Sequence, residues 1–246
     1  LALEINPFIV IQPSGQISLI NPRPDMGQGS TQAVPSLLAE ELEVSLDQVT
    51  IIQSDGKGKY GDQTSGGSSS VRALWTPIRQ AGAAAKEMLI KAAAQRWNVP
   101  VSECYAEKAK VIHRPSGKSL TYGEVADDAS KFEIPKDPKL KDPKDFKIIG
   151  KYAPRLDVPA RVTGKAVFGI DVDVPNMVYA VMIHSPLVHV KVVSIDDAAA
   201  LKIKGVQKVV KCERPMPHRK SDAVAIIADN PHTFIYLPDF AAGLVV

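Results

Sequence analysis

The first third of the chain alternates between β-like runs and one helical stretch. The apolar runs FIVI (8–11) and ISLI (17–20) flank QPSGQ, whose Pro, Ser and Gly predict the turn of a β-hairpin. Residues 49–53, VTIIQ, predict a further strand. Between them, apolar residues recur at helical spacing from Ser30 to Leu42, with Ser30 or Thr31 as the expected N-cap. The predicted order is strand, strand, glycine turn, helix, strand.

Residues 54–72 show no periodicity and are dominated by Gly and Ser. The longest helical pattern follows at about Trp75–Trp97, where Ala-rich sequence offers a small-residue face for close packing. A hairpin is expected at 109–122, with RPSGK as its turn. Residues 131–147 then carry two KDPK repeats and almost no apolar content, which predicts a Pro/Lys-rich linker over 131–150.

Beyond this linker the chain is rich in Val and Ile, and we expect strands in 160–186 and 190–196. Residues 197–211 predict a short helix, a Gly turn and another strand. The expected organisation is an α+β chain with a first domain at 1–130, the linker at 131–150, a compact second domain at 151–230, and a tail at 231–246 without a clear pattern.

Composition and charge narrow the function. The 246 residues are 45% hydrophobic and 23% charged, which is typical of a globular protein. A net charge of +3, with the lysines mixed among acids, argues against a nucleic-acid partner. Cys104 and Cys212 have no metal-type spacing, although one bridge between them stays open. The apolar runs are too short for a membrane span, and the absence of an initial Met suggests a mature or trimmed product.

Two glycine-rich loops are the main candidates for chemistry. Gly27, Gln28 and Gly29 precede the first helix, and Gly67 with Ser68, Ser69 and Ser70 precedes the long one. Each could be a simple turn or a flexible loop. Alternatively, each could present amide N–H groups and hydroxyls to phosphate or oxo groups at a helix N-terminus. The spacing fits neither a Rossmann fingerprint nor a P-loop.

Other polar residues are expected to be structural or solvated. The five histidines have no ligand-type spacing and no marked catalytic partner: His113, His184, His189, His218 and His232. Glu40 and Glu41 are expected on a solvated helix face. Asp171 and Asp173 are expected to alternate on a strand and face solvent. We predict no metal ligands in this chain.

The loops and their surroundings carry a family resemblance. DMGQG followed by LLAEELEVSLDQVTIIQSD, then GGSSS and the Ala-rich helix, resembles the molybdopterin-binding region of the xanthine dehydrogenase and aldehyde oxidoreductase family. Residues 155–196 resemble the α/β hammerhead domain of that family. The order, molybdopterin-binding segment first, is similar to the branch of isoquinoline 1-oxidoreductase beta subunits and membrane-linked aldehyde dehydrogenases.

This resemblance implies a partial molybdopterin-binding domain, a mixed sheet with long helices, followed by a hammerhead domain. It implies that Gly27, Gln28 and Gly29 lie against the pterin and the molybdenum oxo group. It implies that Gly67, Ser68, Ser69 and Ser70 hold the pterin phosphate. The sequence departs from the family at two positions: Asp25 stands where Glu is usual, and Gln32 where Thr is common.

The resemblance also implies an activity and partners. The assembled protein would oxidise an aldehyde or N-heterocycle, a small-molecule substrate, with water as oxygen donor. Its cofactor would be molybdopterin with molybdenum, the cytosine dinucleotide form being favoured. Electrons would pass to a small subunit with [2Fe–2S] clusters and on to a cytochrome c or another acceptor. The expected location is the periplasm, with the cytoplasm as the alternative.

The family's GGGFGG-like loop and the GExP-like segment with its catalytic glutamate are not found in this chain. We therefore expect no catalytic residue here, and a chain that is inactive alone. It would be the N-terminal portion, or a separate chain, of a large subunit whose remainder completes the site. The alternatives are a non-catalytic scaffold or truncated remnant that binds no metal, and a nucleotide-binding module, which the glycine spacing supports poorly.

Overall fold

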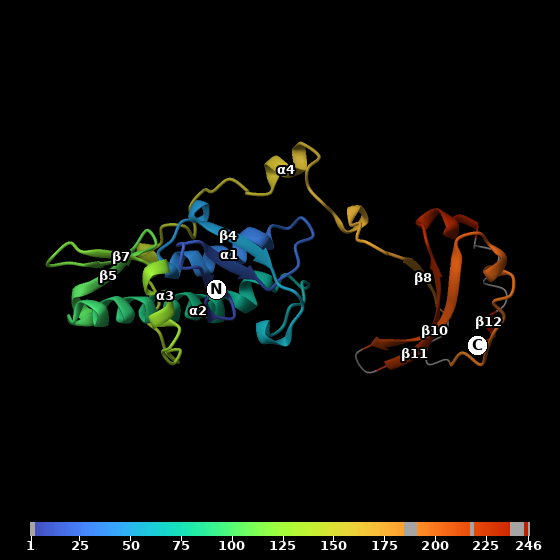
Figure 1. Cartoon of the computed structure of the whole chain (residues 1–246), viewed down its shortest axis with the longest axis horizontal. Helices are drawn as coiled ribbons and strands as arrows, with labels where there is room; N and C mark the ends of the chain where they lie inside the picture. Colours follow the sequence, from blue (N-terminus) through green and yellow to red (C-terminus); the bar gives the residue numbers. More distant parts are fainter. Residues whose placement is uncertain (1–2, 185–190, 217–218, 237–243, 246) are drawn as a thin grey trace. The chain divides into compact units, whose positions relative to one another are not determined.

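The computed structural model describes residues 3–184, 191–216, 219–236 and 244–245. The chain forms two compact units, Leu1–Lys165 and Ala166–Val246, which are described separately (Figure 1). No helix in the described ranges is both long and apolar enough to span a membrane.

The first unit is built on a four-stranded sheet in the order β1-β2-β3-β4. Its strands are β1 (Leu3–Asn6), β2 (Ile9–Ile11), β3 (Ile17–Asn21) and β4 (Val49–Gln53). The hairpin of β2 and β3 is antiparallel, as predicted, while β3 and β4 are parallel neighbours. Helix α1 (Ser30–Leu42) connects these two parallel strands and has the predicted bounds.

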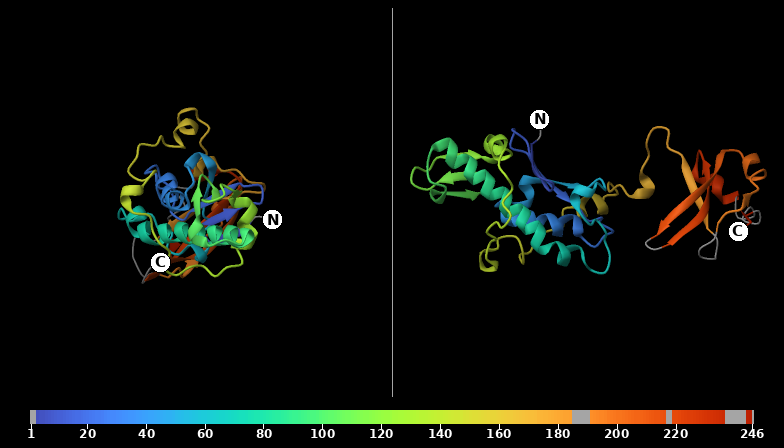
Figure 2. Two further views of the ribbon diagram at one scale, coloured as in Figure 1. Left: turned by 90° about the vertical axis from the view of Figure 1, so that its left-hand side faces the viewer. Right: turned by 90° about the horizontal axis from the view of Figure 1, so that it is seen from below.

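The long helix α2 (Ser70–Trp97) packs against α1 (Figure 2). It begins five residues before the predicted start. Its Gly82 lies at the point of closest approach, where an added Cβ would be 2.8 Å from the Leu38 carbonyl oxygen. The small-residue face predicted for this helix is therefore where the two helices meet.

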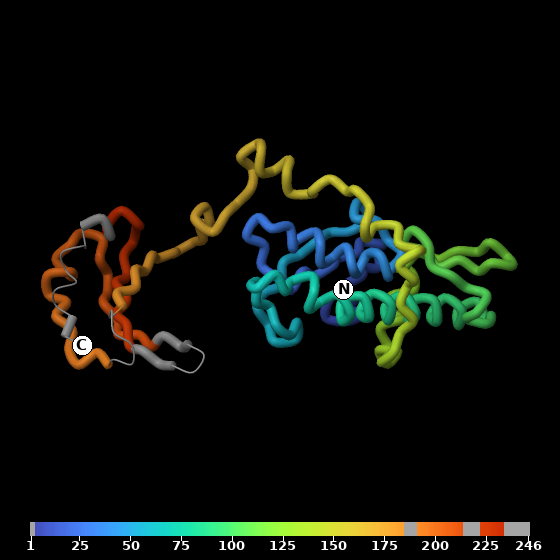
Figure 3. The backbone as a smooth tube through the Cα atoms, turned by 180° about the vertical axis from the view of Figure 1, so that it is seen from behind, coloured from blue at the N-terminus to red at the C-terminus, as the bar shows by residue number. Residues whose placement is uncertain are grey.

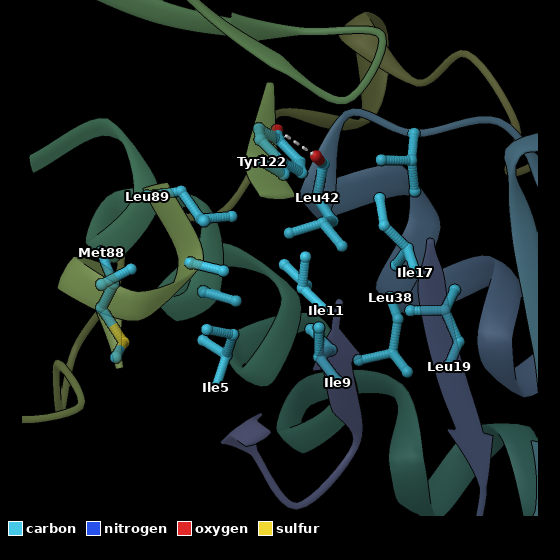
Figure 4. Packing of buried hydrophobic residues seen from close by; sticks show 14 of the residues in the cluster. Ile5, Ile9, Ile11, Ile17, Leu19, Leu38, Leu42, Met88, Leu89 and Tyr122 are labelled. Carbon is cyan, nitrogen blue, oxygen red and sulfur yellow. Dashed lines mark hydrogen bonds between the residues drawn. The ribbon is translucent and has the colours of Figure 1, made fainter. Parts of the chain in front are cut away.

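A single apolar core joins the sheet to both helices. Ile9, Ile11 and Leu19 from the sheet face Leu38 and other buried side chains (Figure 4). Tyr122 closes one end of this core: its hydroxyl donates to the Leu42 carbonyl at 2.6 Å, and its burial raises its pKa. Each such large side chain contributes roughly 1.5–3 kcal/mol through burial.

A small sheet follows α2, with strand order β5-β6-β7. Its strands are β5 (Cys104–Glu107), β6 (Lys110–His113) and β7 (Ser119–Thr121), and the last two form the predicted hairpin. Helix α3 (Tyr122–Ala129), not predicted, begins with a Thr121–Glu124 capping box. Short 3₁₀ helices lie at Leu46–Gln48, Gly58–Tyr60, Val101–Glu103 and Pro143–Asp145.

The expectation that Glu40 and Glu41 are solvated is wrong. Their exposed fractions are 1% and 0%. Glu40 accepts hydrogen bonds from the amides of Lys147, Ile148 and Ile149 and pairs with the Lys141 ammonium at 2.7 Å. Buried carboxylates need such partners. Here the partners lie about a hundred residues further along the chain, so the sequence around Glu40 could not predict its burial.

The other carboxylate of this pair, Glu41, pairs with Arg79 of α2 at 2.7 Å and accepts the Lys141 amide at 2.9 Å. The Pro/Lys-rich segment predicted as a linker, 131–150, is thus held on the first unit. The division between the two units falls after Lys165 rather than in this segment. We call residues 139–150 the strap, because Glu40 and Glu41 of α1 hold this segment against the helix.

The second unit contains a three-stranded antiparallel sheet in the order β10-β11-β8 (Figure 1). Figure 3 traces the course of its backbone in orange and red. Its strands are β8 (Tyr179–His184), β10 (Val206–Met216) and β11 (Arg219–Ala228), and a separate pair is made by β9 (Ser194–Ile195) and β12 (Leu244–Val245). Its 3₁₀ helices are Gly169–Asp171, Ala200–Lys202 and Pro231–Tyr236. Ile226 and Ala200 are at the centre of a small core.

The predicted strands of 160–186 are mostly wrong. Helix α4 (Val158–Val162) and the 3₁₀ turn at Gly169–Asp171 occupy the first part, and only β8 is a strand. Within the described residues nothing pairs with 166–178, so backbone N–H and C=O groups there have no ladder to join. Asp171 and Asp173 are exposed as expected, but not on a strand. The end of the strand predicted in 160–186, the start of the one predicted in 190–196 and much of the tail are not tested, because residues 185–190 and 237–243 fall outside the described residues.

Candidate functional site

Both glycine loops leave the sheet at the same edge. The first follows the carboxyl end of β3 and the second the carboxyl end of β4, its parallel neighbour, with Asn21 opposite Gln53. Each loop then enters a helix, so the N-termini of α1 and α2 follow the two loops. Ligands of open sheets bind outside the carboxyl ends of parallel strands, where helix N-termini supply free amides.

The first loop is shaped by its glycines and by Asp25. Gly27 has φ 104 and Gly29 has φ 92, values that favour glycine. Gly29 is the N-cap residue of α1, in place of the predicted Ser30 or Thr31. The Asp25 carboxylate accepts the Gly27 amide at 2.7 Å and the Thr31 amide at 2.8 Å.

The charge of Asp25 is stabilised by this arrangement. Burial raises the pKa of its carboxyl, but the hydrogen bonds from Thr31 and Gly27 outweigh burial and lower the pKa below its usual range. Asp25 therefore acts as a side-chain cap for the first turn of α1.

The Gln28 side chain is turned into its own loop. Its Oε1 accepts the Met26 amide at 2.6 Å, and its Nε2 donates to the Pro24 carbonyl and the Ser30 hydroxyl, both at 3.0 Å. By contrast, no hydrogen bond from the Gln28 backbone amide is formed within the described part of the chain. The backbone, rather than the side chain, is the open donor of this loop.

The second loop presents small residues at the start of α2. Gly67 has φ 57 and Ser68 has φ 53, and a Cβ on Gly67 would meet nothing within 4 Å. Ser69 is the N-cap residue, and its hydroxyl donates back to the Gly66 carbonyl at 2.7 Å. Ser70 opens the helix and is half-buried. The loop thus leaves open space above amides and hydroxyls.

Arg23 joins the two loops. It is 1% exposed, and its Nη1 donates to the Thr64 carbonyl and to Asp62 across the second loop. Ser65 adds a hydrogen bond to the Pro24 carbonyl at 2.7 Å. The Nε of Arg23 is buried without a partner in the described structure. A buried guanidinium directly before the DMGQG motif was not singled out from the sequence, where nothing marks it as buried.

A cavity of about 430 Å³ lies beside these loops. Gln28 and Gly29 line it from the first loop, and Val71 and Trp75 line it from the first turns of α2. Residues 148–151, together with Ala153 and Arg155, complete its wall. The first loop and the N-terminal turns of both helices therefore border one cavity, and Val71 on its wall directly follows the second motif, whose own residues 67–70 do not line it.

A second cavity, of about 290 Å³, also borders Gly29 and is lined by Val49, Ile51 and Leu156 among others. Gly29, Gln32 and Arg155 line both cavities. Gln32 donates to the Pro154 carbonyl at 3.1 Å and accepts the Leu156 amide at 2.8 Å. Gln32 therefore fixes residues 154–156 beside the first loop.

The donors fit an acceptor-rich, phosphorylated group. Glycines without neighbouring atoms at their Cβ positions allow close approach to the backbone, and open amides with Ser hydroxyls match phosphate and carbonyl oxygens. Among the described residues no cluster of His, Cys, Asp or Glu could hold a metal ion by itself.

Other candidates do not join the site. His113 is buried between Ser116 at 2.7 Å and Glu103 at 2.9 Å, a structural role. Both cysteines are free. His184 and His232 are exposed on the second unit, and His189 and His218 lie outside the described residues.

Comparison with known proteins agrees with this geometry. Residues 7–196 match a family model described as a molybdopterin cofactor-binding domain. Residues 163–236 match one described as the a/b hammerhead domain of aldehyde oxidase and xanthine dehydrogenase. The predicted fold class, α+β with a partial molybdopterin-binding domain followed by a hammerhead domain, is confirmed.

Three curated relatives align over most of the chain. The beta subunit of isoquinoline 1-oxidoreductase from Brevundimonas diminuta is 30% identical, over 88% of this chain and 32% of the relative. The membrane-bound aldehyde dehydrogenase (pyrroloquinoline-quinone) of Gluconacetobacter polyoxogenes is 31% identical, over 87% and 28%. A nicotinate dehydrogenase subunit of Pseudomonas putida is 27% identical, over 84% and 18%. The chain spans about a third or less of the length of these relatives.

Proposed function

Because the chain belongs to the molybdopterin cofactor-binding family, we propose that its two glycine loops hold part of a molybdopterin that carries molybdenum. The observation that supports this most directly is the position of the loops. Both follow the carboxyl ends of adjacent parallel strands, both precede helix N-termini, and both helices border one cavity. A long phosphorylated cofactor needs more than one anchor, and this edge offers two.

The roles of the residues follow from their open atoms. The amide of Gln28 and the uncrowded backbone at Gly27 and Gly29 approach the pterin side of the cofactor. The amides and hydroxyls of Gly67 and of Ser68, Ser69 and Ser70 take the phosphate, aided by the positive end of the α2 dipole. Asp25 and Arg23 keep the two loops in shape.

The cofactor, when bound, supplies two-electron oxidation of an aldehyde or N-heterocycle with water as the oxygen donor. We assign no catalytic residue to this chain, so the rest of a large subunit, or a separate chain, completes the site. We further propose the cytosine dinucleotide form, a small [2Fe–2S] subunit, a cytochrome c or other acceptor, and a periplasmic location. The names of the relatives, which include oxidoreductase and dehydrogenase subunits, support an assembled oxidoreductase.

The alternative is a scaffold that binds no metal. One observation favours it: the Gln28 side chain is satisfied within its own loop, as in a simple turn. The name of the aldehyde dehydrogenase relative also specifies pyrroloquinoline quinone. A test must therefore separate molybdopterin, quinone and no cofactor.

The test is native mass spectrometry with metal and quinone analysis of the protein purified without denaturant from its source. About one molybdenum per complex, as expected for one cofactor site, together with larger and iron–sulfur partners, supports the proposal. A metal-free species of 26.5 kDa without partners contradicts it, and quinone without molybdenum would assign a different cofactor.

A further inference from the structure

Arg155 binds the first loop from outside. Its Nη1 donates to the Gly27 carbonyl at 2.9 Å, while its Nε and Nη2 donate to the Asp157 carboxylate at 2.9 and 2.6 Å. The guanidinium is therefore fixed by a two-point ion pair before it reaches the loop. The hydrogen bond from Arg155, against the opposing effect of burial and with a further hydrogen bond from Arg161, lowers the pKa of Asp157 to about 2, so this pair is charged at neutral pH.

The segment that carries Arg155 is anchored as well. Gln32, in the first turn of α1, holds the Pro154 carbonyl with its Nε2 and the Leu156 amide with its Oε1. Arg155 lies between these two attachments. Its position relative to Gly27 is thus set by the same helix that the loop enters.

Because the peptide bond is planar, the hydrogen bond from Arg155 to the Gly27 carbonyl also fixes the direction of the Gln28 N–H. The carbonyl of Gly27 and the amide of Gln28 belong to one trans peptide and point in opposite directions. With the carbonyl turned toward Arg155, the Gln28 N–H points away from it. This amide donates no hydrogen bond in the described structure, whereas the amides of Gly27 and Thr31 are bound by Asp25.

Asp25 and the Gln28 side chain restrain the loop on either side of this peptide, and Arg155 binds the peptide group itself. Gly27 has no side chain, so on its side of the Gly27–Gln28 peptide the backbone has more rotational freedom than at any other residue type. Such a rotation would replace an outward N–H by an outward carbonyl, which repels phosphate, oxo and other acceptor groups. The contact from Arg155 is the one interaction of the Gly27 carbonyl in the described ranges.

We propose that Arg155 is a positioning residue that holds the Gly27–Gln28 peptide with its N–H outward, toward the group that the loop binds. The inference rests on the proposed function for the nature of that group. Its effect is transmitted through Gly27, so Arg155 itself need not touch the cofactor.

The first arm of the test uses the full chain without cofactor. The residual dipolar coupling of the Gln28 amide reports the direction of its N–H bond. In the unmodified protein we expect a value that fits one orientation. In Arg155→Gln we expect a reduced, averaged value. In Arg155→Lys, which keeps the charge but lacks the forked guanidinium that reaches Asp157 and Gly27 together, we expect an intermediate value. Arg114→Gln, an exposed arginine against Tyr105 on the small sheet, is the matched control and should change nothing at Gln28.

The second arm measures binding of molybdopterin with molybdenum to the same proteins. We expect about tenfold weaker binding to Arg155→Gln, the usual cost of one charge-assisted hydrogen bond acting through the loop, with a melting temperature close to that of Arg114→Gln. A Gln28 coupling that is unchanged in Arg155→Gln overturns the inference, as does an averaged coupling with unaltered binding. If the unmodified protein itself binds no molybdopterin, the proposed function fails, while the coupling alone still decides the role of Arg155.

Discussion

The two ends of helix α1 use polar groups in opposite ways. At its C-terminal end, Glu40 and Glu41 are buried and every carboxylate oxygen is bound by the strap, Lys141 or Arg79. At its N-terminal end, Gly27–Gly29 leaves an amide open beside a cavity of about 430 Å³. One helix thus carries a closed ionic cluster and an open set of donors.

This difference between the two ends of α1 assigns stability to one end and ligand binding to the other. A buried charge with all its partners inside the chain stabilises one arrangement and offers nothing to a ligand. A donor left open at a helix N-terminus costs little in water and gains most when an acceptor arrives. Changes at the strap end should therefore alter stability, and changes at the loop end should alter binding.

The largest effect is expected from Glu40→Gln. The amide cannot accept three backbone hydrogen bonds and also neutralise Lys141, so a buried ammonium loses a partner. We expect a loss of about 3–5 kcal/mol in the free energy of unfolding, measured by urea titration. Glu133→Gln, at an exposed carboxylate, is the control. A loss no larger than that of the control would show that the strap is not held by this cluster.

The same carboxylate predicts a pH dependence. Burial raises the pKa of Glu40, but Lys141 and the amides of Ile149, Ile148 and Lys147 outweigh burial and lower the pKa below 4.5. The stabilisation is therefore complete above pH 4.5 and is lost as the pH falls through the folded-state pKa. The stability difference between the unmodified protein and Glu40→Gln should shrink as urea titrations are repeated below this pH, and a constant difference would contradict this.

Gly82→Ala tests the packing between the two ends. Alanine normally stabilises a helix relative to glycine by roughly 1 kcal/mol. Here its Cβ would lie 2.8 Å from the Leu38 carbonyl oxygen and 2.9 Å from the Glu41 Cβ. We expect the opposite sign, a loss of about 1–3 kcal/mol from overpacking. Gly58→Ala, where a Cβ meets open space, is the control. A stabilised Gly82→Ala would mean that the helices separate easily.

Asp25→Asn tests the loop end. Asparagine has one side-chain oxygen where aspartate has two, so either the Gly27 amide or the Thr31 amide loses its acceptor. The expected loss is about 1 kcal/mol, as for other helix caps, measured by thermal unfolding against Asp145→Asn at an exposed site. A loss as large as that of Glu40→Gln would remove the contrast between the two ends.

The smallest effect on stability is expected from the double variant Ser68→Ala and Ser70→Ala. Neither hydroxyl makes a hydrogen bond in the described structure, so unfolding free energy should stay within about 0.5 kcal/mol. Binding of molybdopterin, measured by titration, should nevertheless weaken. Unaltered binding would remove the second loop from the site.

The sequence pattern correctly predicted the elements that depend on interactions between residues close together in the chain. The bounds of α1, the β2–β3 hairpin and β4 follow from apolar spacing and turn residues, and the structure has them there. The two glycine motifs were also recognisable from sequence. That the helices following these motifs border one cavity was not, because this depends on β3 and β4 being parallel neighbours.

The predictions were wrong where burial or strand formation depends on residues far apart in the sequence. Glu40 and Glu41 look like surface residues until Lys141 and the strap amides are brought to them. Residues 166–178 alternate like a strand but lack a neighbouring strand in the described structure. Arg23 and Arg155 carry no local sign of their roles, since each acts on a loop contacted only after folding.

The most direct test of the account is hydrogen exchange measured by mass spectrometry on the full chain, with and without molybdopterin carrying molybdenum. The account predicts slower exchange on binding in peptides that cover 24–31 and 64–72, with no change at 139–147 of the strap. Binding that leaves both loops unprotected, or protection confined to these strap residues, would contradict the assignment of the cofactor to the N-terminal end of α1.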